Sequence, residues 1–322
     1  MSNYREMPGM NQSLLKKILI SPSSYLKTKE EMYIDTDEDH YRLGHLFDFI
    51  MTEDMSTFKE HYVVDEGDFK TSETIFGILN QAASEMDYSD DNLIAIAKNF
   101  EYGKNWKNET ILDKIKTEGW EQYVDFRINA VGKKMVSLTE YNNCVMSKLK
   151  LTRNKYTKKY FSTNSFIEIQ KKVVITNVVS GVSMKYELDK VVINHKAKKI
   201  QPIDYKTMSG STSSFMYNFW KLRYDFQGAM YWDACLDHYE DLMSKGYTVL
   251  PFRFIVVEPA GVSEPMIYQM SEETHLAAMR GTEIPPKTVE GVQQAIERLT
   301  WHMTNDEWDY PMEYYEKGCI II

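Results

Sequence analysis

Residues 200–208 read IQPIDYKTM, a stretch typical of a buried strand that nevertheless carries an acid and a lysine, Asp204 and Lys206. Side chains alternate between the two faces of a strand, so these two lie on the same face, roughly 6 to 7 Å apart along the chain. Burying both charges is costly unless each has a partner such as an opposite charge or a metal ion. Taken alone, the pair is explained most simply by an ion pair at a strand end.

The segments around this stretch predict a sheet. Residues 165–179, 182–194 and 198–207 are rich in Val, Ile and Tyr, which predicts three consecutive strands. Ser213 or Ser214 could then cap a long helix from about 215 to 244, ending before Gly246. A further strand is expected over 247–258 and a final helix over about 288–304. This order of elements indicates an α/β core.

The first half of the chain has a different pattern, mostly helical. Residues 11–27 begin with apolar residues at helical spacing, and the helix is expected to stop at Ser21-Pro22. A second helix is expected over 41–51, and residues 70–160 remain mainly helical and polar. Because no Pro- or Gly-rich linker divides the chain, we expect a single domain over 1–322, with a helical part over 1–160 and the α/β core over 161–322.

The composition excludes several classes of protein. No segment reaches the roughly 18 consecutive apolar residues of a membrane helix, and the first ten residues lack the layout of a signal peptide, so a cytoplasmic location is expected. The three cysteines, Cys144, Cys235 and Cys319, are widely separated, which argues against a disulfide framework, a zinc site or an iron–sulfur cluster.

The net charge of -9 argues against nonspecific nucleic-acid binding over the whole surface. A local basic track is still present in KLKLTRNKYTKKY, residues 148–160, which contains no acid. Basic residues interleaved with aromatic residues suit a surface that binds phosphates and bases, and a solvated helix face explains the same run equally well. The candidate nucleic-acid-binding residues are Lys148, Lys150, Arg153, Lys155, Lys158 and Lys159.

A second acid is expected beside Asp204. In VSMKYELDKVV the apolar positions alternate with Lys185, Glu187 and Asp189, and Asp204 follows Asp189 by a turn and a return strand. Adjacent antiparallel strands can place the two carboxylates side by side. Mg²⁺, or Mn²⁺, suits such a site, because Mg²⁺ is usually bound by one or two carboxylates together with water and substrate phosphate. Lys206 could hold a water beside the metal or help to deprotonate it.

The expected helix after the loop adds polar character near this edge. Tyr224, Gln227 and Tyr231 are spaced i, i+3, i+7 and so share one helical face. A tyrosine stripe on a helix usually belongs to the core. The amide of Gln227 in the middle of the stripe requires a polar partner.

These motifs together resemble a known family. The order LDKVV, PIDYKT and YDFQGAMY is similar to the PD-(D/E)XK nuclease superfamily, specifically its RecB-like and phage RecE-like exonuclease branch. Residues 11–27, 41–51, 252–271 and the WDY at 308–310 also resemble parts of that family, whereas about 75–130 does not. The resemblance implies a restriction-endonuclease-like core, with a mixed central sheet flanked by helices and a helical N-terminal region.

The resemblance also implies roles for individual residues. Asp189 and Asp204 would bind the metal, with the backbone carbonyl of Tyr205 as a further ligand. Lys206 would position the attacking water and stabilise developing charge, and the side chains that would support the active site and the DNA backbone are Gln227 and Tyr231.

The sequence departs from the family at Asp48, where the family usually has His, four residues after Gly44. A carboxylate suits Mg²⁺, so Asp48 is retained as a candidate metal ligand, but the departure puts a count of two metals in doubt. His45 is expected to be a partly buried residue, and Glu187 a surface charge or a spare ligand. Either of two residues on the preceding strand, Glu168 or Gln170, could match an upstream acid of the family.

The expected activity is therefore a Mg²⁺-dependent or Mn²⁺-dependent DNA exonuclease. From the resemblance, it would act at duplex ends in phage-type recombination, form a homo-oligomer and have a single-strand annealing protein as a partner. The alternatives are an endonuclease or single-strand nuclease of the same superfamily, a non-catalytic DNA-binding protein of the same fold, and a protein with only a structural ion pair.

Overall fold

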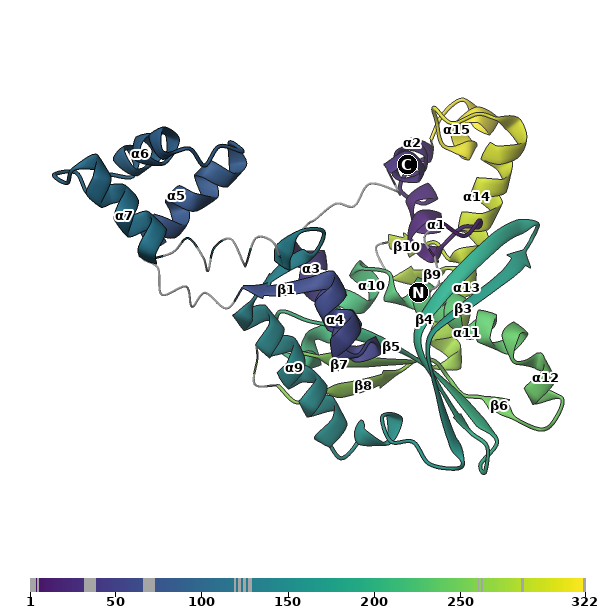
Figure 1. The fold of residues 1–322 in the computed structure, drawn as a ribbon. Helices are drawn as coiled ribbons and strands as arrows, with labels where there is room; N and C mark the ends of the chain where they lie inside the picture. The colour runs from purple at the N-terminus through teal and green to yellow at the C-terminus, as the bar shows by residue number, and fades with distance from the viewer. Residues whose placement is uncertain are drawn as a thin grey trace. The chain divides into compact units, whose positions relative to one another are not determined.

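The structure is a computed structural model that describes residues 4, 6–31, 39–65, 73–118, 120, 123, 126, 129–259, 261, 263–284 and 287–320 (Figure 1). The chain divides into two compact units. One contains Met1–Thr52 and Cys144–Ile322, and the other contains Glu53–Asn143. The expected metal-site residues all belong to the first unit, which is described first.

A mixed sheet of six strands forms the centre of this unit, and a mixed central sheet is what the family resemblance implies. The strand order is β3-β4-β5-β7-β8, with β6 also paired to β5. The pairs β3–β4, β4–β5 and β7–β8 are antiparallel, whereas β5–β6 and β5–β7 are parallel. The strands are β3 (Ile167–Val179), β4 (Val182–Asn194), β5 (Lys199–Thr207), β6 (Thr248–Val249), β7 (Arg253–Val257) and β8 (Met266–Gln269).

A two-residue turn sets the register of the first hairpin. Ser180 and Gly181 both have positive φ, 50° and 81°, as a type I′ turn requires between right-twisted strands. On the other side of β4, pairing with β5 ends at Lys190 opposite Ile203. One further step along each strand leads to Asp189 and Asp204. The two acids therefore lie where β4 and β5 begin to separate.

The prediction of one long helix over 215–244 is wrong in one respect. The segment is helical, but it is broken into α10 (Phe215–Lys221), α11 (Tyr224–His238) and α12 (Glu240–Met243). The first break falls at Arg223, whose φ of 57° is left-handed and cannot continue a helix. The expected cap differs too. Ser214 occupies the N-cap position of α10, but its hydroxyl makes no capping bond and donates to the carbonyl of Ser211, while Ser211 caps the short 3₁₀ turn before it.

The expected strand over 247–258 is interrupted between β6 and β7, where Pro251 lies. Proline has no N–H to donate to a neighbouring strand, so pairing stops there. The final long helix, α14 (Val292–Asn305), begins later than the expected 288, since Thr288 belongs to β10 (Lys287–Val289), which pairs with β9 (Thr282–Ile284).

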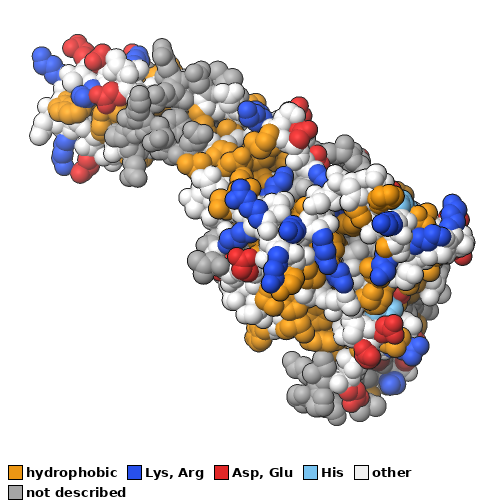
Figure 2. Space-filling view, turned by 90° about the horizontal axis from the view of Figure 1, so that it is seen from below, with side chains coloured by type: hydrophobic (Ala, Val, Ile, Leu, Met, Phe, Trp, Pro, Cys, Tyr) orange, Lys and Arg blue, Asp and Glu red, His pale blue; other side chains and the backbone are white. Residues whose placement is uncertain are grey.

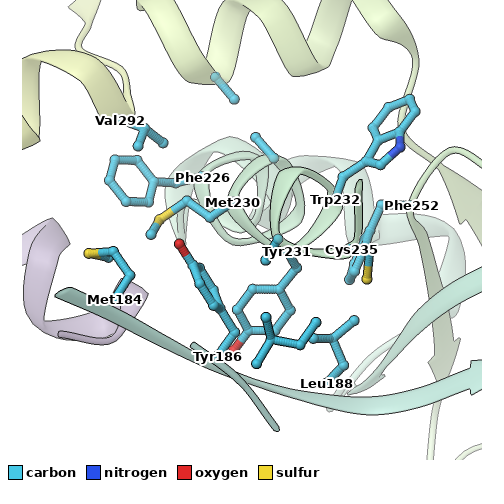
Figure 3. Packing of buried hydrophobic residues seen from close by; sticks show 14 of the residues in the cluster. Met184, Tyr186, Leu188, Phe226, Met230, Tyr231, Trp232, Cys235, Phe252 and Val292 are labelled. Carbon is cyan, nitrogen blue, oxygen red and sulfur yellow. The ribbon is translucent and has the colours of Figure 1, made fainter. Parts of the chain in front are cut away.

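Helix α11 packs its buried side chains against one face of the sheet (Figure 3). Tyr231 of α11 lies edge-on to Tyr186 of β4, with 5.9 Å between ring centroids, and to Phe252 at 6.0 Å. The opposite face is covered in part by α3 (Asp39–Thr52), whose Phe47 ring lies 6.2 Å from that of Tyr205. Helices therefore flank the sheet, which confirms the α/β architecture.

The N-terminal segment joins this core directly. The expected helix ends as predicted: α1 spans Gln12–Ile18, and Pro22 is the first residue of α2 (Pro22–Glu31), where its missing N–H has no cost. Before α1, Met10 pairs with the free edge of β4, donating to Ser183 O and accepting from Lys185 N. The buried Lys185 ammonium also donates to the carbonyls of Tyr4 and Met7.

The C-terminal helices α13 (Glu272–Arg280) and α15 (Met312–Lys317) belong to the same unit. The Trp308 ring, in the WDY at 308–310, stacks on Tyr25 of α2 with 5.4 Å between centroids and on His302 of α14 at 5.3 Å. This tryptophan therefore has a packing role.

The second unit has its own core of apolar side chains from α5 (Glu73–Ser84), α6 (Asp90–Asn99) and α7 (Asn108–Glu118). It also contains α4 (Met55–His61) and a short parallel pair, β1 (Tyr62–Asp65) and β2 (Lys134–Ser137), which the mainly helical prediction for 1–160 missed. Helix α9 (Leu138–Arg153) follows β2. Across the residues that the structure describes, no helix is both long and apolar enough to cross a membrane.

Candidate active site

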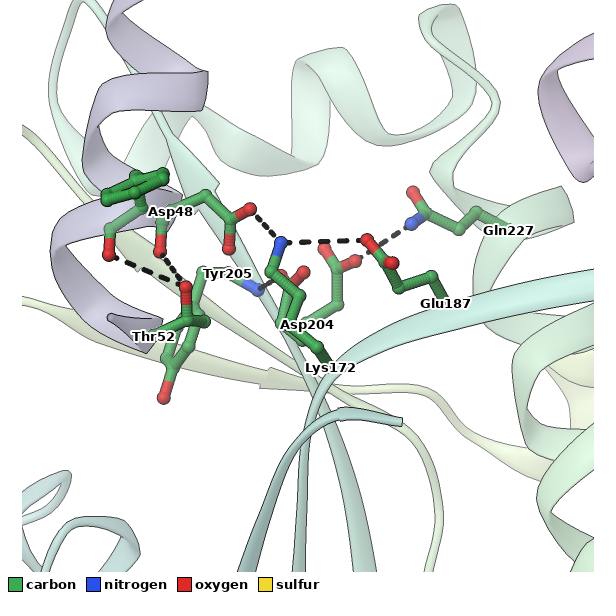
Figure 4. A network of polar contacts seen from close by, with 9 residues as sticks. Asp48, Thr52, Lys172, Glu187, Asp204, Tyr205 and Gln227 are labelled. Carbon is green, nitrogen blue, oxygen red and sulfur yellow. Dashed lines mark hydrogen bonds and ion pairs between the residues drawn. The ribbon is translucent and has the colours of Figure 1, made fainter. Parts of the chain in front are cut away.

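The charges of the IDYKT stretch on β5 are paired with each other and with a helix. Lys206 Nζ lies 2.5 Å from Asp204 Oδ2, and the Asp204 carboxylate is almost fully buried. Gln227 of α11 donates from Nε2 to Asp204 Oδ1 at 2.8 Å (Figure 4). The ion pair expected from the sequence is therefore present, and Asp204 is the polar partner that the buried amide of Gln227 requires.

Asp189 reaches the same place from β4. Its Oδ2 accepts a hydrogen bond from the backbone N–H of Tyr205 at 2.7 Å, a group left unpaired because β4 and β5 separate there. Burial raises the pKa of Asp189 well above its ordinary value, and the charges of Asp204 and Asp48 raise it further. The two carboxylates on neighbouring strands are thus close enough to repel each other, as a cation site requires.

The charge state of Lys206 distinguishes between its two expected roles. Burial lowers its pKa, but the carboxylates of Asp204 and Asp189 outweigh burial and raise it above the ordinary value. Lys206 is therefore an ammonium at neutral pH, which favours a hydrogen-bond donor over a proton acceptor. Burial likewise raises the pKa of Asp204, against the opposing effect of the Lys206 charge.

Asp48 of α3 also faces this cluster, but through a lysine that sequence reasoning missed. The Lys172 ammonium, from β3, forms a short ion pair with Asp48 Oδ2 and lies 3.6 Å from Glu187 Oε1 (Figure 4). Glu187 therefore contacts a cation of the site instead of being a surface charge only. No sequence pattern marks Lys172, which is one of two adjacent lysines in a strand of ordinary composition.

The alternation of side chains along β4 breaks beside these residues. Tyr186 and Leu188 belong to the core cluster that packs around α11, and so do Val191 and Ile193. An uninterrupted strand cannot direct Leu188 and Val191 to one side, because they are an odd number of residues apart. The change falls at Asp189, where the carboxylate turns toward β5.

The tyrosines of the predicted α11 stripe have separate environments. Tyr231 is a core residue, as the simpler explanation of the stripe requires, and burial raises its pKa well above the ordinary value. The Tyr224 ring lies 4.9 Å from Lys206 Nζ, close enough for a cation–π contact. Tyr224 is thus nearer to the charged cluster than the sequence indicated.

The upstream acids form a different network. Glu168 Oε2 lies 3.1 Å from His195 Nε2, and Gln170 donates to Glu168 Oε1 while it accepts from the Tyr239 hydroxyl at 2.6 Å. None of these contacts involves a carboxylate of β4 or β5. The expectation for His45 is wrong, since its side chain is exposed on α3.

The basic run is divided between structural and exposed residues. Lys148 donates to the carbonyl of Ile50 and Lys150 to that of Gly261, each at 2.5 Å, so both are committed to backbone oxygens. The exposed members are Arg153, Lys155, Lys158 and Lys159. Figure 2 shows one face of the molecule on which lysine and arginine side chains lie among apolar ones.

A cavity of about 600 Å³ adjoins this run and shares Asn154, Lys155 and Tyr156 with it, the rest of its lining coming from residues 264–267. The Lys155 ammonium lies 4.6 Å from the Tyr156 ring. None of the carboxylates of the candidate site lines this cavity.

The donor set fits a hard cation bound mainly by two carboxylates. Asp48 Oδ1 is a buried oxygen that accepts no hydrogen bond, and Asp204 Oδ2 is a buried oxygen that meets the Lys206 ammonium. Within the described ranges, no three Asp, Glu, His or Cys side chains are arranged to enclose a metal by themselves. Mg²⁺ does not need such a cage, because it keeps several waters and takes further oxygens from substrate phosphate.

The chain was compared with protein families, curated proteins and solved structures. No family model matches the sequence, and no curated protein matches it either. Among solved structures, one described as "Putative exonuclease" from Eubacterium rectale is similar, with 13% sequence identity and a TM-score of 0.43, covering 98% of this chain and 89% of the other. A likeness of this degree establishes neither the family nor the activity of this chain.

Proposed function

We propose that this protein is a metal-dependent DNA exonuclease that hydrolyses phosphodiester bonds at duplex ends. The observation that carries the proposal is the convergence of Asp189, Asp204 and the Lys206 ammonium where β4 and β5 separate. Two acids and a donor at the point where two strands separate match the chemistry of phosphate hydrolysis. The order of these residues also matches the PD-(D/E)XK pattern in the sequence.

Asp189 and Asp204 are the proposed ligands of Mg²⁺ or Mn²⁺, and Asp48 and the Tyr205 carbonyl are the further candidates. When bound, the ion would polarise the scissile phosphate and promote ionisation of a nearby water. The protein supports this with charges that are already fixed in place. Lys206 would hold the attacking water and offset negative charge on the phosphate, consistent with its raised pKa.

Gln227 has a positioning role in this proposal. Its hydrogen bond fixes Oδ1 of Asp204, which leaves Oδ2 directed toward the lysine and the proposed ion. Tyr231 supports the same helix from the core. The exposed basic residues 153–159 are the proposed contacts to the DNA backbone.

Three finer features belong to the proposal through the family resemblance alone. They are a role in phage-type recombination, a homo-oligomer, and a single-strand annealing protein as partner. A cytoplasmic location is proposed from the sequence features described above.

The decisive experiment is digestion of linear duplex DNA labelled at its 5′ or 3′ ends, with and without Mg²⁺. We expect labelled products only with the metal, and a closed circular duplex should resist. Degradation of the circle would instead favour an endonuclease, and DNA binding without cleavage in Mg²⁺ or Mn²⁺ would favour a non-catalytic protein of the same fold.

Lys206→Met tests the central residue. We expect it to lower cleavage by about 10² to 10³ fold, the usual effect of removing one preorganised donor, while duplex binding is retained. Lys199→Met is the matched control, because Lys199 is an exposed lysine at the other end of the same strand. Equal cleavage by both variants would contradict the role given to Lys206.

A further inference from the structure

Lys172 has a backbone conformation that its position in a strand does not explain. Its φ is 50°, in the left-handed region, although it lies in the middle of β3. The register pairs residues 171 with 190 and 173 with 188, but no pair joins Lys172 and Asp189. A lysine in this conformation costs about 1 to 2 kcal/mol, and such strain persists only where the surrounding contacts maintain it.

Those contacts are carboxylates. The Lys172 ammonium forms its short ion pair with Asp48 of α3 and lies 3.6 Å from Glu187 of β4. The Lys172 side chain therefore places a positive charge among acids that come from two different elements of the fold, α3 and β4.

The charges of the cluster disfavour a second divalent ion. The carboxylates of Asp48, Glu187, Asp189 and Asp204 already interact with the ammonium groups of Lys172 and Lys206. These cations offset part of the negative charge that would hold a second ion. The two ammonium groups also have different partners, since Lys206 pairs with Asp204 and Lys172 with Asp48.

We propose that the Lys172 ammonium takes the place of a second divalent cation, so that this site binds a single Mg²⁺ or Mn²⁺ ion, between Asp189 and Asp204. Asp48 then serves the site chiefly by holding Lys172. This inference rests on the proposed function, because it concerns the ion that the proposed nuclease uses. It accounts for the strained backbone, which brings the side chain to the carboxylates.

The test measures metal stoichiometry and does not depend on cleavage. MnCl₂ is titrated into the full chain by calorimetry, in parallel for the unmodified protein and its variants. We expect one bound ion per chain for the unmodified protein and two for Lys172→Gly. Glycine is chosen because it removes the ammonium and favours the positive φ, so the strand should fold. Lys172→Met, with a similar side-chain length and no charge, should give the same result.

Lys171→Met is the matched control, because it removes the same charge one residue away. The Lys171 ammonium donates to the carbonyl of Thr52 at 3.0 Å, so this variant should still bind one ion. Two ions in the unmodified protein, or one ion in both Lys172 variants, would overturn the inference and leave the proposed function standing. No bound ion in the unmodified protein would overturn both, which separates the two failures.

Discussion

Replacing Arg223 by alanine should destabilise the protein by about 3 to 5 kcal/mol, because it leaves a buried carboxylate without its partner. The Asp225 side chain is fully buried, and the Arg223 guanidinium meets it through Nε at 3.1 Å and Nη2 at 3.2 Å. The same Nη2 also donates to the carbonyl of Glu290 at 2.7 Å. The substitution removes all of these bonds at the break that sets the direction of α11.

Two further variants separate the cost of the unpaired Asp225 carboxylate from the strain of the left-handed backbone at residue 223. Arg223→Gly loses the same bonds but relieves the left-handed conformation, so it should be more stable than Arg223→Ala by about 1 kcal/mol. Adding Asp225→Asn to Arg223→Ala should recover about 2 kcal/mol, because an unpaired amide is less costly to bury than an unpaired charge. The measurement is urea unfolding followed by tryptophan fluorescence, with Trp220 and Trp232 in the helices on either side of the break.

The reasoning fails if the free energy of unfolding of Arg223→Ala lies within about 1 kcal/mol of that of the unmodified protein. A difference so small is the net value expected of an exposed ion pair. It fails as well if Asp225→Asn makes Arg223→Ala less stable, since the buried charge would then not be the source of the cost.

Three further outcomes are expected from the same structure. Burial and the neighbouring carboxylates raise the pKa of Asp189, so protons compete with the metal there and Mn²⁺ affinity should fall as the pH is lowered; calorimetric titrations at a series of pH values would refute this if the affinity stayed constant. Gly228→Ala should cost about 1 to 3 kcal/mol in urea unfolding, since the added Cβ would lie 2.8 Å from Met270 Cε and 3.1 Å from Phe254 Cζ, and an unchanged midpoint would show that the core adjusts freely. Tyr205→Phe should raise the free energy of unfolding by about 1 kcal/mol, because it removes a buried hydroxyl that has no hydrogen-bond partner, and a loss of stability would point to a partner for that hydroxyl.

The strands and the acids of the site could be predicted from the sequence because they depend on local patterns. Alternation and β-branched residues located β3, β4 and β5 closely, and the return strand after Asp189 placed Asp204 beside it. The amide of Gln227 was also informative, since a buried amide must find a polar partner.

The remainder depends on backbone conformations that no spacing reveals. Lys172 and Arg223 are ordinary residues in their segments, and each has a positive φ and an ion pair, Lys172 with Asp48 and Arg223 with Asp225. The strand pair β1–β2 was missed for a similar reason, since its two members lie about seventy residues apart and each is only four residues long.

The contact between the N-terminal segment and β4 has a consequence for the order of events during synthesis. Met10 cannot pair until Ser183 and Lys185 have left the ribosome, and Lys185 is also the residue that fixes the carbonyls of Tyr4 and Met7. Contacts separated by so much chain form late, because a large loop must close first. The segment that contains Met10 therefore docks late, and until it does β4 presents an unpaired edge to any other extended chain nearby.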